Sequence, residues 1–116
     1  MSAYKDLLVW QKSFLICREI YNLTQGFPGS ELFGLTDQIR RSAVSVMSNI
    51  AEGSRRSRKE WRHFIRISFA SAAELESQLL LAKDLGFGNP DKYGRIFEEL
   101  NDVSRILYHF LFKTVH

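Results

Sequence analysis

The sequence predicts an all-α fold, an antiparallel up-down-up-down four-helix bundle in which residues 1–116 form a single domain. Glycine and proline gather at a few breaks, which divide the chain into four segments. Within each segment, apolar residues recur at alternating spacings of three and four, the pattern of a helix with one buried face. No run of residues alternates with a period of two, so we expect no strand.

The first helix is expected from about Leu7 to Thr24, with Asp6 as its N-cap and Gly26 as its stop. Residues at helical spacing predict its buried stripe: Trp10, Phe14, Cys17, Ile20, Tyr21 and Thr24. The connection that follows, residues 25–34, is longer than the other two. Its large apolar residues are expected to cover one end of the core: Phe27, Leu32 and Phe33.

The second helix is expected from about Leu35 to Glu52, with Gly53 as its stop. Its apolar residues predict one buried stripe: Leu35, Ile39, Ala43, Val46 and Ile50. The helix is also rich in serine and alanine, which let a neighbouring helix approach closely. Its opposite side is polar and carries these residues: Gln38, Arg41, Ser45, Ser48 and Glu52.

The third helix, expected from about Arg58 to Leu85, begins with a capping box formed by Ser57 and Glu60. Its residues step by four and three along a heptad seam typical of helical bundles: Trp61, Ile65, Ser68, Ala72, Leu75, Leu79 and Ala82.

The fourth helix is expected from about Pro90 to Lys113, with Asn89 as its cap. Pro90 suits the first helical position, where its missing N–H has no cost. The buried stripe is predicted to be Tyr93, Ile96, Leu100, Val103, Leu107 and Phe110. A second line widens the apolar surface: Phe97, Ser104, Tyr108 and Leu111.

The composition fits a globular protein that needs no disulfide bond and no structural metal ion to fold. Hydrophobic residues make up 45% and aromatic residues 13% of the chain, which is enough bulk for a core. Cys17 is the single cysteine, so no internal disulfide forms, and we expect a reducing, cytoplasmic location. The start of the chain has no apolar run after a basic lead, and no apolar stretch approaches the ~20 residues of a membrane span. We therefore expect neither a signal peptide nor a membrane partner.

Charge is distributed unevenly along the chain. Residues 40–66 contain eight basic and two acidic residues, a net charge of +6, whereas the rest of the chain carries a net charge of −3. Arg58, Arg62 and Arg66 recur every four residues, so they form a stripe of like charges that repel each other. The stripe begins at a helix N-terminus, where the dipole is already positive and anions bind.

This pattern predicts that the segment contacts the phosphate backbone of RNA or DNA. The predicted contact residues, here called the basic block, are Arg55, Arg56, Arg58, Lys59, Arg62 and Arg66. The alternative is a solvated face whose arginines pair with Glu52, with Glu60 or with a neighbouring subunit. Trp61 lies on the heptad seam, so we interpret it as a core residue rather than as a platform for bases.

We find no pattern that predicts an enzyme. Glu60 and His63 match half of a di-iron motif, but His109 lacks the corresponding glutamate that a second motif needs. Cys17 lies on an apolar stripe and is expected to be a core residue. No phosphate-binding glycine loop or nucleophile motif occurs. The chain is therefore expected to have no catalytic residue, no cofactor, no metal and no small-molecule substrate.

The four helices carry more apolar surface than one small core needs, so we expect a homo-oligomer. A polar face of small residues on the second helix would suit hydrogen bonds between subunits. The predicted subunit-interface residues are Gln38, Arg41, Ser45 and Ser48. Simple exposure of this face is the alternative.

Several stretches resemble a known family. They are FGLTDQIRRSAVSV at 33–46, SNIAEG at 48–53, YKDL at 4–7, VWQK at 9–12 and ELE at 74–76. Together they resemble the four-helix-bundle proteins encoded in intervening sequences of bacterial large-subunit ribosomal RNA genes. The resemblance implies a four-helix bundle and assembly into ring-like homopentamers. One branch resembles the accessory variability determinant of diversity-generating retroelements, which binds nucleic acid and a reverse transcriptase.

One position departs from that family. Relatives often carry proline where this chain has Met47, and a proline would remove a helical hydrogen bond and bend the helix. Met47 therefore predicts a straighter second helix and an altered packing of subunits. From the basic block and the resemblance together we expect a homo-oligomer that binds RNA or DNA. The alternative is a protein–protein adaptor, for a reverse transcriptase or a ribosomal component, that does not itself bind nucleic acid.

Overall fold

The computed structural model describes residues 4–113, which form four α-helices and three short 3-10 helices. The α-helices are α1 (Leu8–Thr24), α2 (Leu35–Ser54), α3 (Arg58–Asp84) and α4 (Tyr93–Phe112). The 3-10 helices are η1 (Tyr4–Asp6), η2 (Gly29–Glu31) and η3 (Pro90–Lys92). No strand occurs between residues 4 and 113, so the prediction of an all-α fold is confirmed.

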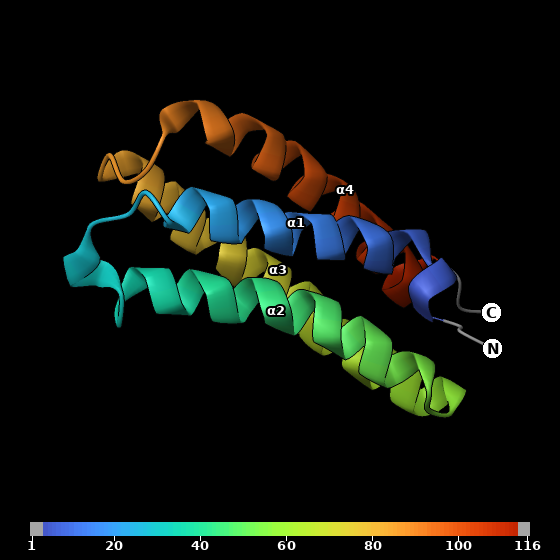
Figure 1. Ribbon diagram of the computed structural model, residues 1–116. Helices are drawn as coiled ribbons and strands as arrows, with labels where there is room; N and C mark the ends of the chain where they lie inside the picture. Colours follow the sequence, from blue (N-terminus) through green and yellow to red (C-terminus); the bar gives the residue numbers. More distant parts are fainter. Residues whose placement is uncertain (1–3, 114–116) are drawn as a thin grey trace.

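The four helices lie side by side in one elongated body of 45 × 24 × 20 Å (Figure 1). α1 packs on α2 and α4, and α3 packs on the same two helices. The connections α1–α2 and α3–α4 lie at one end of the body, and the α2–α3 hairpin lies at the other (Figure 1). This arrangement brings the start of α3 to the same end of the molecule as the end of α4.

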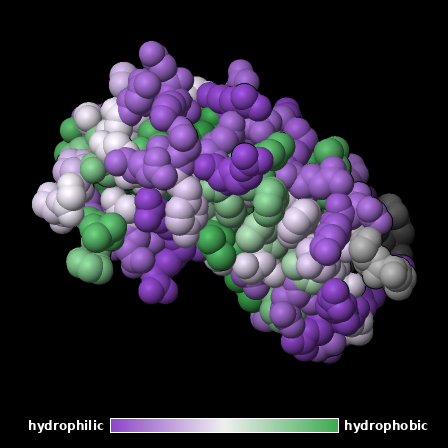
Figure 2. Space-filling model, in the orientation of Figure 1, coloured by the Kyte–Doolittle hydropathy of each residue, from purple (hydrophilic) through white to green (hydrophobic). Residues whose placement is uncertain are grey.

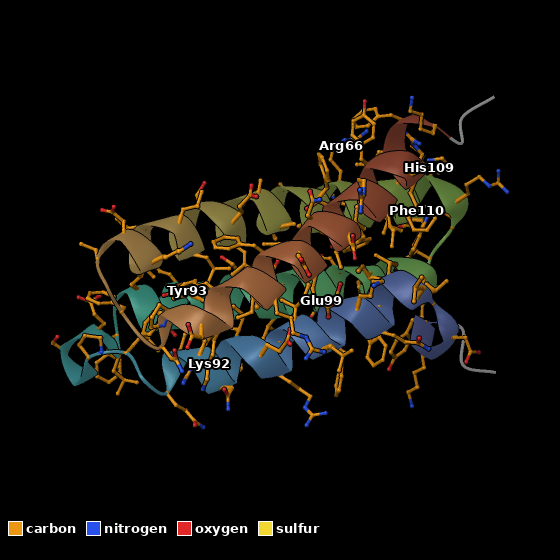
Figure 3. The ribbon with its side chains drawn as sticks, turned by 90° about the horizontal axis from the view of Figure 1, so that it is seen from above. Arg66, Lys92, Tyr93, Glu99, His109 and Phe110 are labelled. Atoms are coloured by element: carbon orange, nitrogen blue, oxygen red, sulfur yellow. The ribbon has the colours of Figure 1, made fainter. Side chains whose placement is uncertain are left out.

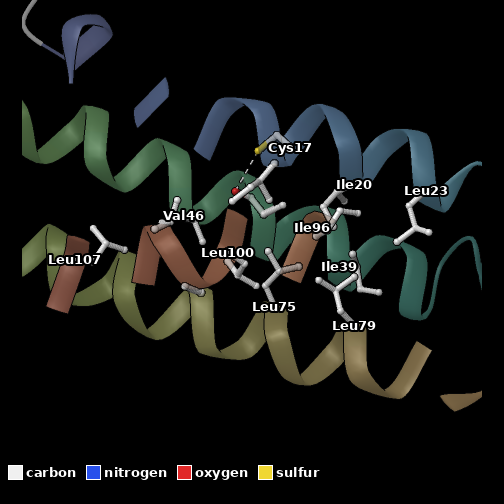
Figure 4. Close-up of a cluster of buried hydrophobic side chains, with 14 of the residues drawn as sticks. Cys17, Ile20, Leu23, Ile39, Val46, Leu75, Leu79, Ile96, Leu100 and Leu107 are labelled. Atoms are coloured by element: carbon white, nitrogen blue, oxygen red, sulfur yellow. Dashed lines mark hydrogen bonds between the residues drawn. The ribbon is translucent and has the colours of Figure 1, made fainter. Parts of the chain in front are cut away.

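The core is one cluster of buried side chains along the axis of the body (Figure 4). The predicted stripes of α2, α3 and α4 supply most of it, and Ile39, Leu75 and Leu100 are each almost completely buried. Trp61 and Phe110 pack at its margin with ring centroids 5.7 Å apart. The spacing of apolar residues therefore identified the buried faces of these three helices correctly.

The stripe predicted for α1 is wrong at two of its aromatic residues, because Phe14 and Tyr21 are exposed. The buried face of α1 includes Cys17, Ile20 and Thr24 of the predicted stripe and also contains Val9, Ser13, Ile16 and Leu23, which lie one position before members of that stripe. These positions have the same helical spacing, so the period alone does not exclude Phe14 and Tyr21. The branched aliphatic side chains fill the space against α2 and α4, and the ring of Tyr21 lies outside, 4.5 Å below the guanidinium of Arg40.

The helix ends confirm one predicted cap and contradict three other signals. Asn89 and Pro90 do not begin α4, because they form the cap and first residue of η3 and α4 begins at Tyr93. Ser57 and Glu60 form the predicted capping box at the start of α3. Asp6 is not the N-cap of α1, because the chain first makes the turn η1 and Leu7 then takes the cap position without a side-chain hydrogen bond. Gly53 does not end α2, which continues to Ser54. Gly53 is instead buried against Trp61 and Phe64 of α3.

The first connection covers the core with one of its three large apolar residues. Phe27 is buried against Phe87, with ring centroids 5.6 Å apart. Gly88 has a φ of +73°, and a Cβ there would lie 3.1 Å from the Phe27 ring. Leu32 and Phe33 are exposed, so the prediction that they cover the core is wrong. They lie beyond the bend at η2, where the chain has already turned toward α2.

Cys17 is a core residue, as predicted. Its Sγ donates a hydrogen bond to the carbonyl oxygen of Ala43 at 3.2 Å (Figure 4). Burial raises the pKa of the Cys17 thiol to about 11, because a thiolate would be poorly solvated there. Within residues 4–113, no helix combines the length and the hydrophobicity that a membrane span requires.

Candidate nucleic-acid interface

The basic block occupies the α2–α3 hairpin and the first turns of α3. Arg55 and Arg56 lie in the turn after α2, and Arg58 is the first residue of α3. The capping box fixes the start of α3: the Ser57 side chain accepts a hydrogen bond from the Glu60 backbone N–H at 3.3 Å. The structure therefore brings the six predicted residues together at one end of the molecule.

Arg56 forms the ion pairs that the alternative interpretation predicts. Its Nε donates to Glu52 at 3.1 Å, and its Nη1 lies 3.6 Å from a carboxylate oxygen of Glu60. The side-chain hydrogen bond to Glu52, followed by the negative charge of that residue, raises the pKa of Arg56. Its guanidinium also lies 5.2 Å from the ring centroid of Phe64. Two carboxylates thus already compensate the charge of Arg56.

Arg62 forms hydrogen bonds to the last turn of α4. Its Nη2 donates to the carbonyl oxygen of Leu111 at 2.9 Å, and its Nη1 to that of Phe110 at 3.4 Å. Carbonyl groups at a helix C-terminus lack partners within the helix and carry partial negative charge, which a guanidinium compensates. Arg62 therefore holds two helices together, a role that the sequence pattern did not predict.

The other basic residues of the block face solvent. Arg58, Lys59 and Arg66 are exposed, and none of them has a carboxylate partner within residues 4–113. Lys59 and Arg66 line one open hollow on α3, and its other lining residues are Glu60, Arg62 and His63. The guanidinium of Arg55 lies 5.6 Å from the ring centroid of Tyr4. These exposed cations form a surface that a polyanion can reach without first breaking an ion pair.

The polar face of α2 is partly used inside the chain. Ser45 and Ser71 share a hydrogen bond of 2.8 Å between α2 and α3. Arg41 pairs with Asp37 at 2.9 Å and remains largely exposed. Gln38 and Ser48 are exposed. Of the four predicted interface residues, Ser45 therefore serves the fold, and the other three are accessible to a second subunit.

The structure groups no metal ligands in the region it describes. Between residues 4 and 113, no three side chains of His, Cys, Asp or Glu lie close enough to hold a metal ion. Glu60 belongs to the capping box and to the ion pair with Arg56. The His63 ring packs on Phe64, with centroids 5.2 Å apart.

Sequence reasoning also missed a group of aromatic rings beside the block. Phe69 of α3 packs on Tyr108 and Phe112 of α4, with ring centroids 6.2 and 6.5 Å apart. The sequence pattern predicts only that Tyr108 widens the apolar surface of α4. The signal that could have found the group is the spacing of Arg62, Arg66 and Phe69, which puts basic and aromatic residues on one line of α3.

The fold and this surface define a class of protein: a small all-α chain of four helices with exposed cations at one hairpin. The sequence pattern of the 23S rRNA-intervening sequence protein family matches residues 5–109. The chain belongs to this family, which confirms the family indicated by its sequence motifs.

One solved structure supports the fold. It is the crystal structure of a protein with unknown function from the S23 ribosomal protein family of Bacteroides thetaiotaomicron. The two chains share 24% sequence identity and superpose with a TM-score of 0.83, over 91% of this chain and 100% of the other. No curated protein matches the sequence.

Proposed function

We propose that this chain is a non-enzymatic, homo-oligomeric protein of the cytoplasm, an antiparallel up-down-up-down bundle that binds the phosphate backbone of RNA or DNA. The observation that carries the proposal is the exposure of Arg58, Lys59 and Arg66, which have no carboxylate partner within residues 4–113. These like charges repel each other at the positive end of a helix dipole, and a bound polyanion would relieve both effects.

The contacts of the block assign different roles to its members. Arg55, Arg58, Lys59 and Arg66 are the residues proposed to contact phosphates. Arg56 contributes little, because Glu52 and Glu60 already compensate its charge. Arg62 helps to position the surface, since its guanidinium holds the end of α4. The proposal thus invokes about four phosphate contacts.

Binding of a short RNA should weaken steeply as salt is added. With about four neutralised phosphates, a plot of log K against log[salt] should have a slope of about −2.8 for a single strand and about −3.6 for a duplex. Fluorescence anisotropy of a labelled oligonucleotide, titrated between about 50 and 200 mM salt, measures this slope. Affinity that does not depend on salt, or no binding at the lowest salt, would contradict the proposal.

Self-association is supported by apolar side chains that the single chain leaves uncovered. Leu8 and Leu15 of α1, and Leu80 and Leu81 of α3, are all exposed. Figure 2 shows hydrophobic residues over the middle of the α1–α2 face, surrounded by hydrophilic ones. A second subunit that covered these side chains would remove apolar surface from water, which favours association.

Light scattering should therefore give a mass that is a multiple of 13.5 kDa at micromolar protein, and five subunits are the proposed assembly. The interface is proposed to include Gln38, Arg41 and Ser48. A monomer at that concentration would contradict this part of the proposal.

The alternative function is a protein–protein adaptor, for example for a reverse transcriptase or a ribosomal component. The exposed Leu80, Leu81 and Leu85 near the end of α3 favour it, because they lie away from the basic block. An adaptor would retain its partner in a pull-down after nuclease treatment. It would also show no salt-sensitive affinity for RNA.

A further inference from the structure

Three aromatic side chains form a surface between α3 and α4, here called the aromatic platform: Phe69, Tyr108 and Phe112. The rings of Tyr108 and Phe112 lie 4.8 Å apart, and both pack on Phe69, which is half-buried. Tyr108 is 46% exposed and Phe112 is 55% exposed. The rings of Tyr108 and Phe112 are therefore supported by Phe69 on the protein side and accessible to solvent on the other side.

The platform continues the basic block. Arg62, Arg66 and Phe69 follow one another at spacings of four and three, so they lie on one line of α3. Arg62 contacts the carbonyl groups of residues 110 and 111, and Phe69 contacts the rings of Tyr108 and Phe112. Arg66, which lies between them on that line, is next to the same turns of α4. Figure 3 shows Arg66 at the end of the molecule where α4 carries His109.

The surroundings of the platform favour a negatively charged ligand. Residues 61–73 of α3 and residues 103–113 contain no aspartate or glutamate, but they contain Arg62, Arg66, Arg105 and Lys113. Arg105 pairs with Asp102, and the other three have no carboxylate partner in the region that the structure describes. Charge complementarity thus points to a polyanion as the occupant.

We propose that the nucleic acid is single-stranded and that its unpaired bases stack on Tyr108 and Phe112 while the adjacent cations hold its phosphates. This inference rests on the proposed function and names the ligand of that same surface. Exposed rings next to a basic groove bind single strands, because every unpaired base has a face that can stack. In a duplex the base faces are stacked on one another, and only the edges of the bases are accessible in the grooves.

The test compares three probes of about 12 nucleotides: a single strand, an abasic strand with the same number of phosphates, and a duplex. The wild-type protein should bind the single strand at least about fivefold more tightly than the abasic strand. The double variant Tyr108→Leu, Phe112→Leu should bind both strands with equal affinity, because leucine keeps the apolar bulk and removes the ring. Phe33→Leu is the control, since this ring is 92% exposed at the opposite end of the molecule, and it should change neither affinity.

The outcomes separate the two proposals. Equal binding of the single strand and the abasic strand by the wild type would overturn base stacking and leave phosphate binding intact. Tighter binding of the duplex than of the single strand would also overturn base stacking and leave phosphate binding intact. Absence of binding to all three probes at low salt would overturn the proposed function, and base stacking with it. The wild-type comparison stands even if the double variant does not fold, which circular dichroism would reveal.

Discussion

Reversing the charges of Arg58 and Arg66 should weaken the binding of single-stranded RNA about 25-fold at 0.1 M salt. For a single strand, each neutralised phosphate contributes about −0.7 to the salt slope, which corresponds to a factor of about 5 between 1 M and 0.1 M salt. The variant Arg58→Glu, Arg66→Glu removes two such contacts, and the new carboxylates add repulsion. The slope should also become shallower by about 1.4.

The Arg58→Glu, Arg66→Glu variant should have the same free energy of unfolding as the wild type. Weaker binding of RNA by this variant would therefore not be caused by unfolding. Position 58 is the first residue of α3, and a glutamate there interacts favourably with the helix dipole. The matched control is Arg18→Glu, Lys83→Glu, which changes the net charge equally at two exposed positions outside the block. Anisotropy titrations of the two variants should differ clearly. Equal weakening by both would mean that net charge, rather than this surface, determines binding.

Gly53→Ala should lower the free energy of unfolding by up to about 2 kcal/mol, although alanine is the better helix former. A Cβ at position 53 would lie 2.8 Å from the Cβ of Phe64 and 3.1 Å from the Trp61 ring. The Phe64 Cβ is bonded directly to the backbone and cannot rotate away, so α3 must shift relative to α2. The overpacking cost of about 1–3 kcal/mol exceeds the helix-propensity gain of about 1 kcal/mol.

Gly94→Ala provides the control with the opposite sign. A Cβ at Gly94 would meet no atom within 4 Å, and this residue lies in the first turn of α4. The substitution should therefore raise the free energy of unfolding by about 0.5–1 kcal/mol. Urea denaturation followed by circular dichroism measures both values. If Gly53→Ala were stabilising as well, the close approach of α2 and α3 would not constrain this position.

The sequence predicted the exposed cations of the candidate site but not the role of Arg62. Arg58, Lys59 and Arg66 lie exposed, as their pattern predicts, because charged side chains off the buried seam of a helix favour solvent. The partners of Arg56 are close in sequence, and the alternative interpretation had named them. The role of Arg62 could not be predicted in this way, because its carbonyl partners lie 48 and 49 residues away.

Local periodicity was sufficient for what depends on neighbours within one helix. The all-α class, the buried faces of α2, α3 and α4, the capping box and the position of the basic block all follow from spacings of three and four residues. Tertiary structure alone decided that Phe14 and Tyr21 of α1 are exposed and why glycine occupies position 53. It also decided that Tyr108 and Phe112 lie beside the arginine line of α3. The physical reason is that burial and close approach depend on the helix opposite. Its distance and rotation are set by the packing of all four helices at once.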